Sequence, residues 1–136
     1  DYLDALLWAK SVGSLKGLIA RADANAAVIA DWVAGSSWAA HLAKVPETRS
    51  NTSVCLVIAD PDVTARGPDA VAAVAKQIVS MLEKEKVGFD FGAYRDAPAG
   101  LRIWCGATVE AADLKAFTAW LDWAFAEAKA ALTKAA

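Results

Sequence analysis

Apolar residues recur at helical spacing in two stretches of the first 36 residues. The first stretch covers residues 2–12 and is short, because Gly13 ends it. The second begins at Ser14, which can cap a helix, and continues to Gly35, a residue type that commonly follows the last turn. Charged residues occupy its opposite face, so the pattern predicts an amphipathic helix of about twenty residues. Its apolar stripe is Leu15, Leu18, Ile19, Ala22, Ala26, Ile29, Ala30 and Val33.

Two further helices are predicted in the second half of the chain. The sequence Gly67-Pro68-Asp69 is a typical helix start, with proline in the first turn and an acid beside it, and Gly88 follows the last turn. The final helix begins near Thr108 or Glu110 and continues into an alanine-rich tail. Its inward residues are Leu114, Phe117, Leu121, Ala124, Phe125, Ala128 and Leu132.

Three segments have the composition of strands. Residues 50–59 are β-branched and apolar on both alternating faces, which predicts a strand buried on both sides. Residues 89–93 and 101–105 are shorter strand candidates, connected by residues 95–100. Residues 38–50 and 60–68 have the composition of loops.

The order after the first two helices is therefore β-α-β-β-α. This order predicts an α+β fold, in which a small, mainly antiparallel sheet carries helices on one face and is preceded by a long connecting helix. We expect connecting helices in residues 1–36 and a small domain in residues 37–136.

Composition narrows the classes of function. The chain has 136 residues, 57% of them hydrophobic and 22% charged, with a formal net charge of −2. Such a balance argues against a nucleic-acid-binding surface and against disorder. No apolar run approaches the roughly 20 residues of a membrane helix, so we expect a soluble protein with neither nucleic acid nor membrane as a partner.

Few residues suggest metal or nucleophilic chemistry. Cys55 and Cys105 lie in strand-like segments without CxxC spacing, which is typical of reduced, packed thiols in a cytoplasmic protein. His41 is the only histidine and is expected on the surface.

Arg102 is the most unusual residue of the predicted strands. Leu101 and Ile103 point one way along the strand, while Arg102 and Trp104 point the other way, toward the face that the helices leave uncovered. If this face of the sheet is exposed to solvent, Arg102 is an ordinary solvated surface residue. The apolar residues around it suggest instead that this face meets another protein layer, where an arginine requires an anion. A ligand carboxylate would supply one through two parallel hydrogen bonds.

Four segments carry a resemblance to a known family. They are WAKSVGSLKGLIARADANAAVIADWV, TRSNTSVCL, FGAYRDAPAGLRIWCGATVEAADL and WLDWAFAEA. In this order they resemble the C-terminal third of bacterial phosphoserine aminotransferases, class V enzymes of the fold-type I pyridoxal-phosphate group. The match runs essentially from end to end, and GLRIWCGATVE is its most specific part.

The resemblance implies a cytoplasmic homodimer that exchanges the amino group between glutamate and 3-phosphohydroxypyruvate in serine biosynthesis. The family's arginine for the substrate α-carboxylate falls on Arg102. A basic pair that helps to bind the substrate phosphate or distal carboxylate falls on Tyr94 and Arg95. The family pattern there is His-Arg, and the spacing to Arg102 is one residue longer, so Arg95 is the stronger candidate because a phenol carries no positive charge.

The residues that hold pyridoxal 5'-phosphate are not found in this sequence. In the family a lysine binds the cofactor, and it belongs to a large domain that precedes the matching segment. Lys16, Lys76, Lys84 and Lys86 lie on polar helix faces, and no glycine-rich phosphate loop is present. We therefore expect a piece of a longer protein that catalyses no transamination by itself.

Two other classes of function fit the same pattern. A free-standing ligand-binding or regulatory module would use Arg102 and Arg95 for an amino-acid effector and the first helices for dimerisation. A purely structural packing domain would need neither arginine.

Overall fold

The computed structural model describes residues 1–134 and confirms the α+β class. The small antiparallel sheet has three strands, as a fold of this class requires, but two strands precede α4 and one follows it, so the predicted order β-α-β-β-α after the first two helices is not found. In chain order the elements are α1 (Tyr2–Ser11), α2 (Ser14–Gly35), β1 (Ala39–His41), the 3-10 turn η1 (Pro46–Thr48), β2 (Ser53–Ile58), α3 (Pro61–Thr64), α4 (Pro68–Lys84), β3 (Gly100–Trp104) and α5 (Ala111–Lys134).

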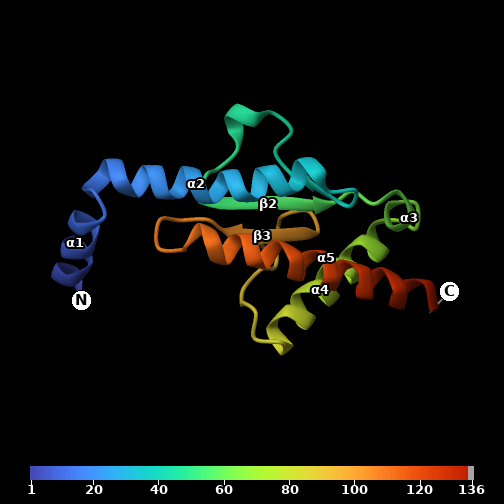
Figure 1. Cartoon of the computed structure of the whole chain (residues 1–136). Helices are drawn as coiled ribbons and strands as arrows, with labels where there is room; N and C mark the ends of the chain where they lie inside the picture. The colour runs from blue at the N-terminus through green and yellow to red at the C-terminus, as the bar shows by residue number, and fades with distance from the viewer. Residues whose placement is uncertain (135–136) are drawn as a thin grey trace.

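The sheet is antiparallel throughout and has the order β1-β2-β3. In the register of the central pair, Cys55 lies opposite Arg102 and Val54 lies opposite Ile103. Helices α2 and α5 run beside each other along the sheet, and α4 crosses α5 at an angle (Figure 1). The sheet therefore carries its helices on one face, as the sequence predicts.

Burial alternates along the central strand. Val54, Leu56 and Ile58 of β2 are at most 4% exposed and belong to the helix-covered core. Cys55 and Val57 point to the other face and are half-buried. The prediction that this strand is buried on both sides is therefore wrong within this chain, because helices of the described residues cover one face only.

The predicted helix ends are confirmed in one case and corrected in another. Helix α4 begins at Pro68, with Asp69 in its first turn, as expected. Helix α2 is preceded by Gly13, whose φ of 100° is accessible to glycine, and the Ser14 side chain makes no capping hydrogen bond. A sharp left-handed junction between α1 and α2 thus replaces the expected serine cap.

Three segments differ from the sequence-based expectation. Residues 39–41, expected as loop, form β1 because they pair with β2. Pro61–Thr64, also expected as loop, is a single helical turn capped by the Asp60 side chain. The expected strand 89–93 is reduced to one bridge between Gly92 and Leu101, because Asp90 adopts a left-handed backbone with φ of 61° that interrupts extended pairing.

Asp60 also joins the short helix to the last one. Its side chain is 8% exposed, and its Oδ2 lies 2.9 Å from Lys129 Nζ of α5. Burial by itself raises the pKa of Asp60, but the hydrogen bonds from Lys129 and from the backbone N–H groups of Val63 and Asp62 outweigh it and hold this pKa below its usual value. The pair therefore stabilises the fold at neutral pH and loses this contribution as pH falls through the carboxyl range.

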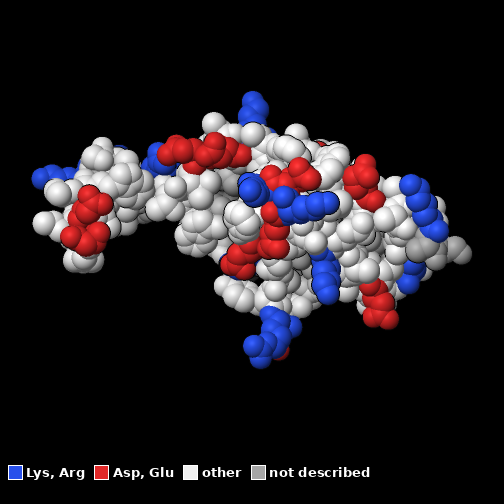
Figure 2. Space-filling view, turned by 90° about the horizontal axis from the view of Figure 1, so that it is seen from below, with Lys and Arg blue, Asp and Glu red and all other residues white. Residues whose placement is uncertain are grey.

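The outer surface is mixed in character. Helix α1 and the first turns of α2 extend away from the sheet (Figure 1), and Leu3, Leu7, Leu15 and Ile19 are at least 50% exposed there. Acidic and basic side chains are interspersed on the face that Figure 2 shows, in keeping with the near-neutral composition.

Among residues 1–134, no helix is long and apolar enough to cross a bilayer, and no three potential metal ligands gather.

Candidate substrate-binding site

Strand β3 places Arg102 on the uncovered face of the sheet. Leu101 and Ile103, its neighbours, are 2% and 1% exposed and anchor the strand in the core. Gly100 lets β3 approach β2 closely, since a Cβ at this position would lie 2.1 Å from the carbonyl oxygen of Leu56. The Gly-Leu-Arg sequence thus combines a close backbone approach, a core anchor and an outward-pointing cation.

Asn25 of α2 fixes the segment that follows β3. Asn25 is 2% exposed, and its amide nitrogen donates to the backbone carbonyls of Cys105, Gly106 and Val109 at 2.8–3.2 Å. Asn25 is not among the residues predicted from the sequence. The available signal was a polar side chain between Ala22 and Ile29, at helical spacing within an apolar stripe.

Arg102 has an anionic partner within its own chain. Its Nη2 donates to Oδ2 of Asp90 at 2.8 Å and makes a longer contact, 3.4 Å, with the Asp90 backbone oxygen. The hydrogen bond to Asp90 raises the pKa of Arg102 above its usual value. The Nε atom is buried and has no hydrogen-bond partner among residues 1–134. The Arg102 side chain is 16% exposed and that of Asp90 85%, so the ion pair lies at the edge of the protein and leaves the buried Nε–H of Arg102 unused.

Tyr94 and Arg95 lie on the connection between α4 and β3. The ring of Tyr94 covers the Arg102 guanidinium, with 4.6 Å between the guanidinium carbon and the ring centroid. Tyr94 is 66% exposed, and Arg95 is exposed beside it. The structure therefore brings Tyr94 against Arg102, while Arg95 follows on the same outer segment.

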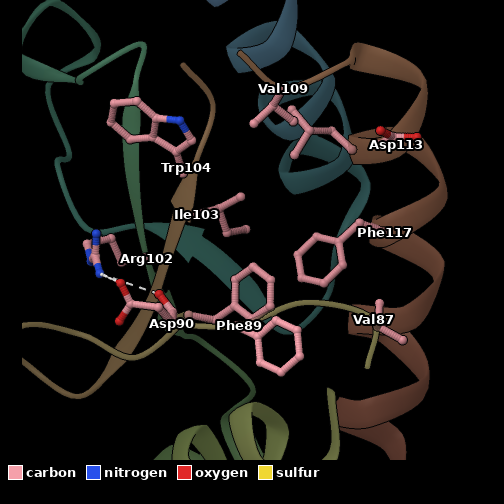
Figure 3. Close-up of a pocket in the computed structure, with 11 residues that line it drawn as sticks. Val87, Phe89, Asp90, Arg102, Ile103, Trp104, Val109, Asp113 and Phe117 are labelled. Atoms are coloured by element: carbon pink, nitrogen blue, oxygen red, sulfur yellow. Dashed lines mark hydrogen bonds and ion pairs between the residues drawn. The ribbon is translucent and has the colours of Figure 1, made fainter. Parts of the chain in front are cut away.

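A cavity of about 270 Å³ adjoins this ion pair. Figure 3 shows Arg102 and Asp90 at one side of it, with Trp104 above them and Phe117 of α5 across the cavity. The lining is predominantly apolar. Its members are Val87, Phe89, Asp90, Phe91, Arg102, Ile103, Trp104, Val109, Asp113, Leu114 and Phe117. Such a site can hold a small molecule that combines an apolar part with a carboxylate.

The remaining candidate residues carry little chemistry. His41 is half-buried rather than a surface residue, because it pairs with Leu56, and burial, followed by the charge of Arg49, lowers its pKa. Cys55 and Cys105 are free, as predicted. Burial raises the pKa of Cys105 to about 11, so this thiol is unreactive at neutral pH.

No lysine of the chain fits a cofactor-binding role. Eight of the nine lysines are exposed. The ninth, Lys129, donates to both Asp60 and Asp62, and these bonds raise its pKa. A lysine that forms a Schiff base requires a desolvated amine with a lowered pKa. The chain's own residues therefore do not fit pyridoxal 5'-phosphate.

The fold resembles part of two solved structures. Phosphoserine aminotransferase from Bacillus circulans subsp. alkalophilus superposes with a TM-score of 0.69 and 20% sequence identity, over 88% of this chain and 30% of that one. Another structure, described as showing radiation damage of the Schiff base in phosphoserine aminotransferase, superposes with a TM-score of 0.68 and 16% identity, again over 88% and 30%.

Sequence relatives with the same name are much closer. Phosphoserine aminotransferases of Methanosarcina mazei and Methanosarcina barkeri are 46% and 47% identical to this chain over 125 residues, or 92% of its length. The chain spans about 31% of the length of these relatives. No family model matches the chain. The resemblance to phosphoserine aminotransferases predicted from the sequence is confirmed for this stretch.

Proposed function

We propose that the chain is the C-terminal small domain of a phosphoserine aminotransferase and contributes the substrate-carboxylate arginine. In this proposal the whole enzyme exchanges the amino group between glutamate and 3-phosphohydroxypyruvate, which yields O-phosphoserine and 2-oxoglutarate. Residues 1–36 connect the small domain to a large domain, and residues 37–136 form the small domain itself.

One observation carries the assignment of Arg102. The guanidinium lies on the open face of the sheet, under the ring of Tyr94, and its buried Nε has no partner. An arginine can bind a carboxylate through two parallel hydrogen bonds, and Asp90 uses only Nη2. A substrate α-carboxylate would satisfy the unused Nε.

The second half of the substrate would lie toward Arg95. Arg95 is exposed on the same segment as Tyr94, which places its charge outside the cavity that holds Arg102. A phosphate or a distal carboxylate is the group that an exposed guanidinium of this kind attracts. We assign Arg95 to this group and Tyr94 to supporting the Arg102 guanidinium and donating a hydrogen bond to the substrate.

The cofactor and the partner subunit belong to the proposal for the whole enzyme. Pyridoxal 5'-phosphate supplies the electron sink for amino-group transfer, and it would be bound by a large domain rather than by residues of this chain. A homodimer in the cytoplasm is the proposed state of that enzyme. A non-catalytic effector-binding module would use the same arginine, but the relatives that match over 92% of the chain are named as aminotransferases.

The proposal is tested by steady-state kinetics of the protein that carries this chain. Replacing Arg102 by alanine removes charge-assisted hydrogen bonds of about 1.5–3 kcal/mol, so kcat/KM should fall roughly 10- to 150-fold for glutamate and for O-phosphoserine alike. Replacing Arg95 by alanine should weaken O-phosphoserine more than glutamate. Arg66→Ala is the matched control, because this exposed arginine contacts the Leu132 backbone oxygen in α5 and should leave both values unchanged.

The two substrates separate the roles of the two arginines. If Arg102→Ala has no more effect than Arg66→Ala, the carboxylate assignment is wrong. If Arg95→Ala weakens both substrates equally, its assignment to the phosphate is wrong while that of Arg102 stands.

A further inference from the structure

The Asp90–Arg102 pair has the geometry of a contact that a ligand can replace. Asp90 accepts from Arg102 through one carboxylate oxygen and one guanidinium nitrogen. A carboxylate bound in the bidentate manner accepts through both of its oxygens from two guanidinium nitrogens. With 85% of the Asp90 side chain exposed, water screens the pair and keeps it weak. The buried Nε of Arg102 remains without a partner while Asp90 is bound. Asp90 thus pairs with Arg102 but leaves part of the hydrogen-bonding capacity of the guanidinium unused.

Asp90 is able to leave without disturbing the core. The next residue, Phe91, is held firmly, because its carbonyl accepts from the Arg102 N–H at 2.8 Å and its ring stacks on Phe117 at 4.6 Å. Asp90 itself precedes this anchor, and the contacts to Arg102 are its side chain's only hydrogen bonds among the described residues. A rotation of the carboxylate toward solvent would release the guanidinium and leave β3 in place.

A second carboxylate cannot approach Arg102 freely while Asp90 remains. Both anions would meet at the same Nη2, and two like charges separated by a few ångströms repel each other. Resting on the proposed function of Arg102, we propose that Asp90 is an internal competitor of the substrate carboxylate. It occupies the arginine in the free protein, is displaced on binding, and so sets the affinity for carboxylate substrates.

A competing role and an orienting role of Asp90 predict opposite effects on substrate affinity when its charge is removed. If Asp90 only oriented the guanidinium, removing its charge would weaken substrate binding. If Asp90 competes, removing its charge strengthens binding, because the substrate no longer has to displace it. Since exposed ion pairs are weak, the gain should be about two- to fivefold.

The backbone of Asp90 dictates which replacements are informative. Its φ of 61° is poorly tolerated by most residues but is accessible to asparagine and glycine. Asp90→Asn removes the charge and keeps the shape, and Asp90→Gly removes the side chain without backbone strain. Asp96→Asn is the matched control, because it makes the same change of charge at an exposed acid of the same connection.

The experiment measures KM for glutamate and the dissociation constant of glutarate, as an inhibitor, in the protein that carries this chain. We expect both constants to fall about two- to fivefold in Asp90→Asn and Asp90→Gly, with kcat nearly unchanged and Asp96→Asn like the parent. In an Arg102→Ala background, Asp90→Asn should have no effect on either constant. Unchanged or higher constants in Asp90→Asn and Asp90→Gly overturn the proposal.

Parallel measurement of Arg102→Ala separates the two possible failures. If Arg102→Ala weakens substrate binding but the Asp90 variants do not strengthen it, the competitor role is wrong and the carboxylate assignment stands. If neither residue affects either constant, the substrate carboxylate binds elsewhere and both proposals fail.

Discussion

Asn25 is the buried polar residue on which the geometry behind Arg102 depends. One amide nitrogen serves three carbonyls of the segment that leaves β3, and it joins α2 to the start of α5. Because buried carbonyls need a donor, Asn25 holds this segment from inside, while Arg21 of α2 donates to the Ala107 carbonyl at 2.8 Å from the half-buried side. Val109, which lines the cavity, is held through its carbonyl by the same side chain.

Replacing Asn25 by alanine should therefore destabilise the fold markedly. The buried carbonyls would lose their donor, at a cost of about 1–3 kcal/mol in the free energy of unfolding. Asn51→Ala is the control, because Asn51 is exposed and donates only to Asp23, and it should change stability by less than about 0.5 kcal/mol. Urea denaturation of the two variants measures the difference, and equal stabilities would show that Asn25 has no structural role.

At the scale of the element, β3 depends on how closely it approaches β2. Its core side chains, Leu101 and Ile103, only reach the helices if the backbone at Gly100 lies against Leu56. The same approach sets the register in which Arg102 lies opposite Cys55. The position of the arginine is therefore a consequence of strand packing.

A methyl group at Gly100 should disturb this pairing. Its Cβ would lie 2.1 Å from the Leu56 carbonyl oxygen, a backbone atom that cannot rotate away, so Gly100→Ala should cost about 1–3 kcal/mol. Gly92→Ala is the matched control, since nothing lies within 4 Å of a Cβ there and the φ is not left-handed. In thermal unfolding, the melting temperature of Gly100→Ala should be clearly lower than that of the parent, and that of Gly92→Ala should equal it. Equal melting temperatures for the two variants would contradict the argument.

The sequence predicts an element when the residues that determine it lie within that element, and fails when the element depends on pairing with a distant segment. Helix α4 and strand β2 carry their own signals, a Gly-Pro start and continuous apolar alternation, and both are found where predicted. Strand β1 has three residues and exists only through its pairing with β2, which no local pattern reveals. No local pattern reveals the interruption at Asp90 either. Residues 89–93 alternate as a strand would, although Asp90 has a left-handed backbone and only one bridge forms. The outward direction of Arg102 was predictable, but its anionic partner was not.

On the scale of the whole molecule, the chain contains the arginine that we propose binds substrate, while none of its lysines fits the cofactor chemistry of amino-group transfer. Its folded part presents one sheet face to the outside, with Trp104 51% exposed and Cys55 half-buried there. The helical extension of α1 and the start of α2 exposes a second apolar surface. Both surfaces suit a domain that completes its site against other protein, in line with the proposed function.

The isolated chain should therefore bind pyridoxal 5'-phosphate only non-specifically. Eight of the nine lysines are solvated amines, and Lys129 is held protonated by Asp60 and Asp62, so none is poised to react. After mixing the purified chain with the cofactor and gel filtration, the visible spectrum should show no stoichiometric band, and glutamate should undergo no transamination. Lys129→Met should give the same spectrum as the parent. A stoichiometric band that survives gel filtration in the parent and disappears in one lysine variant would identify a cofactor site within this chain and contradict its assignment as a small domain without one.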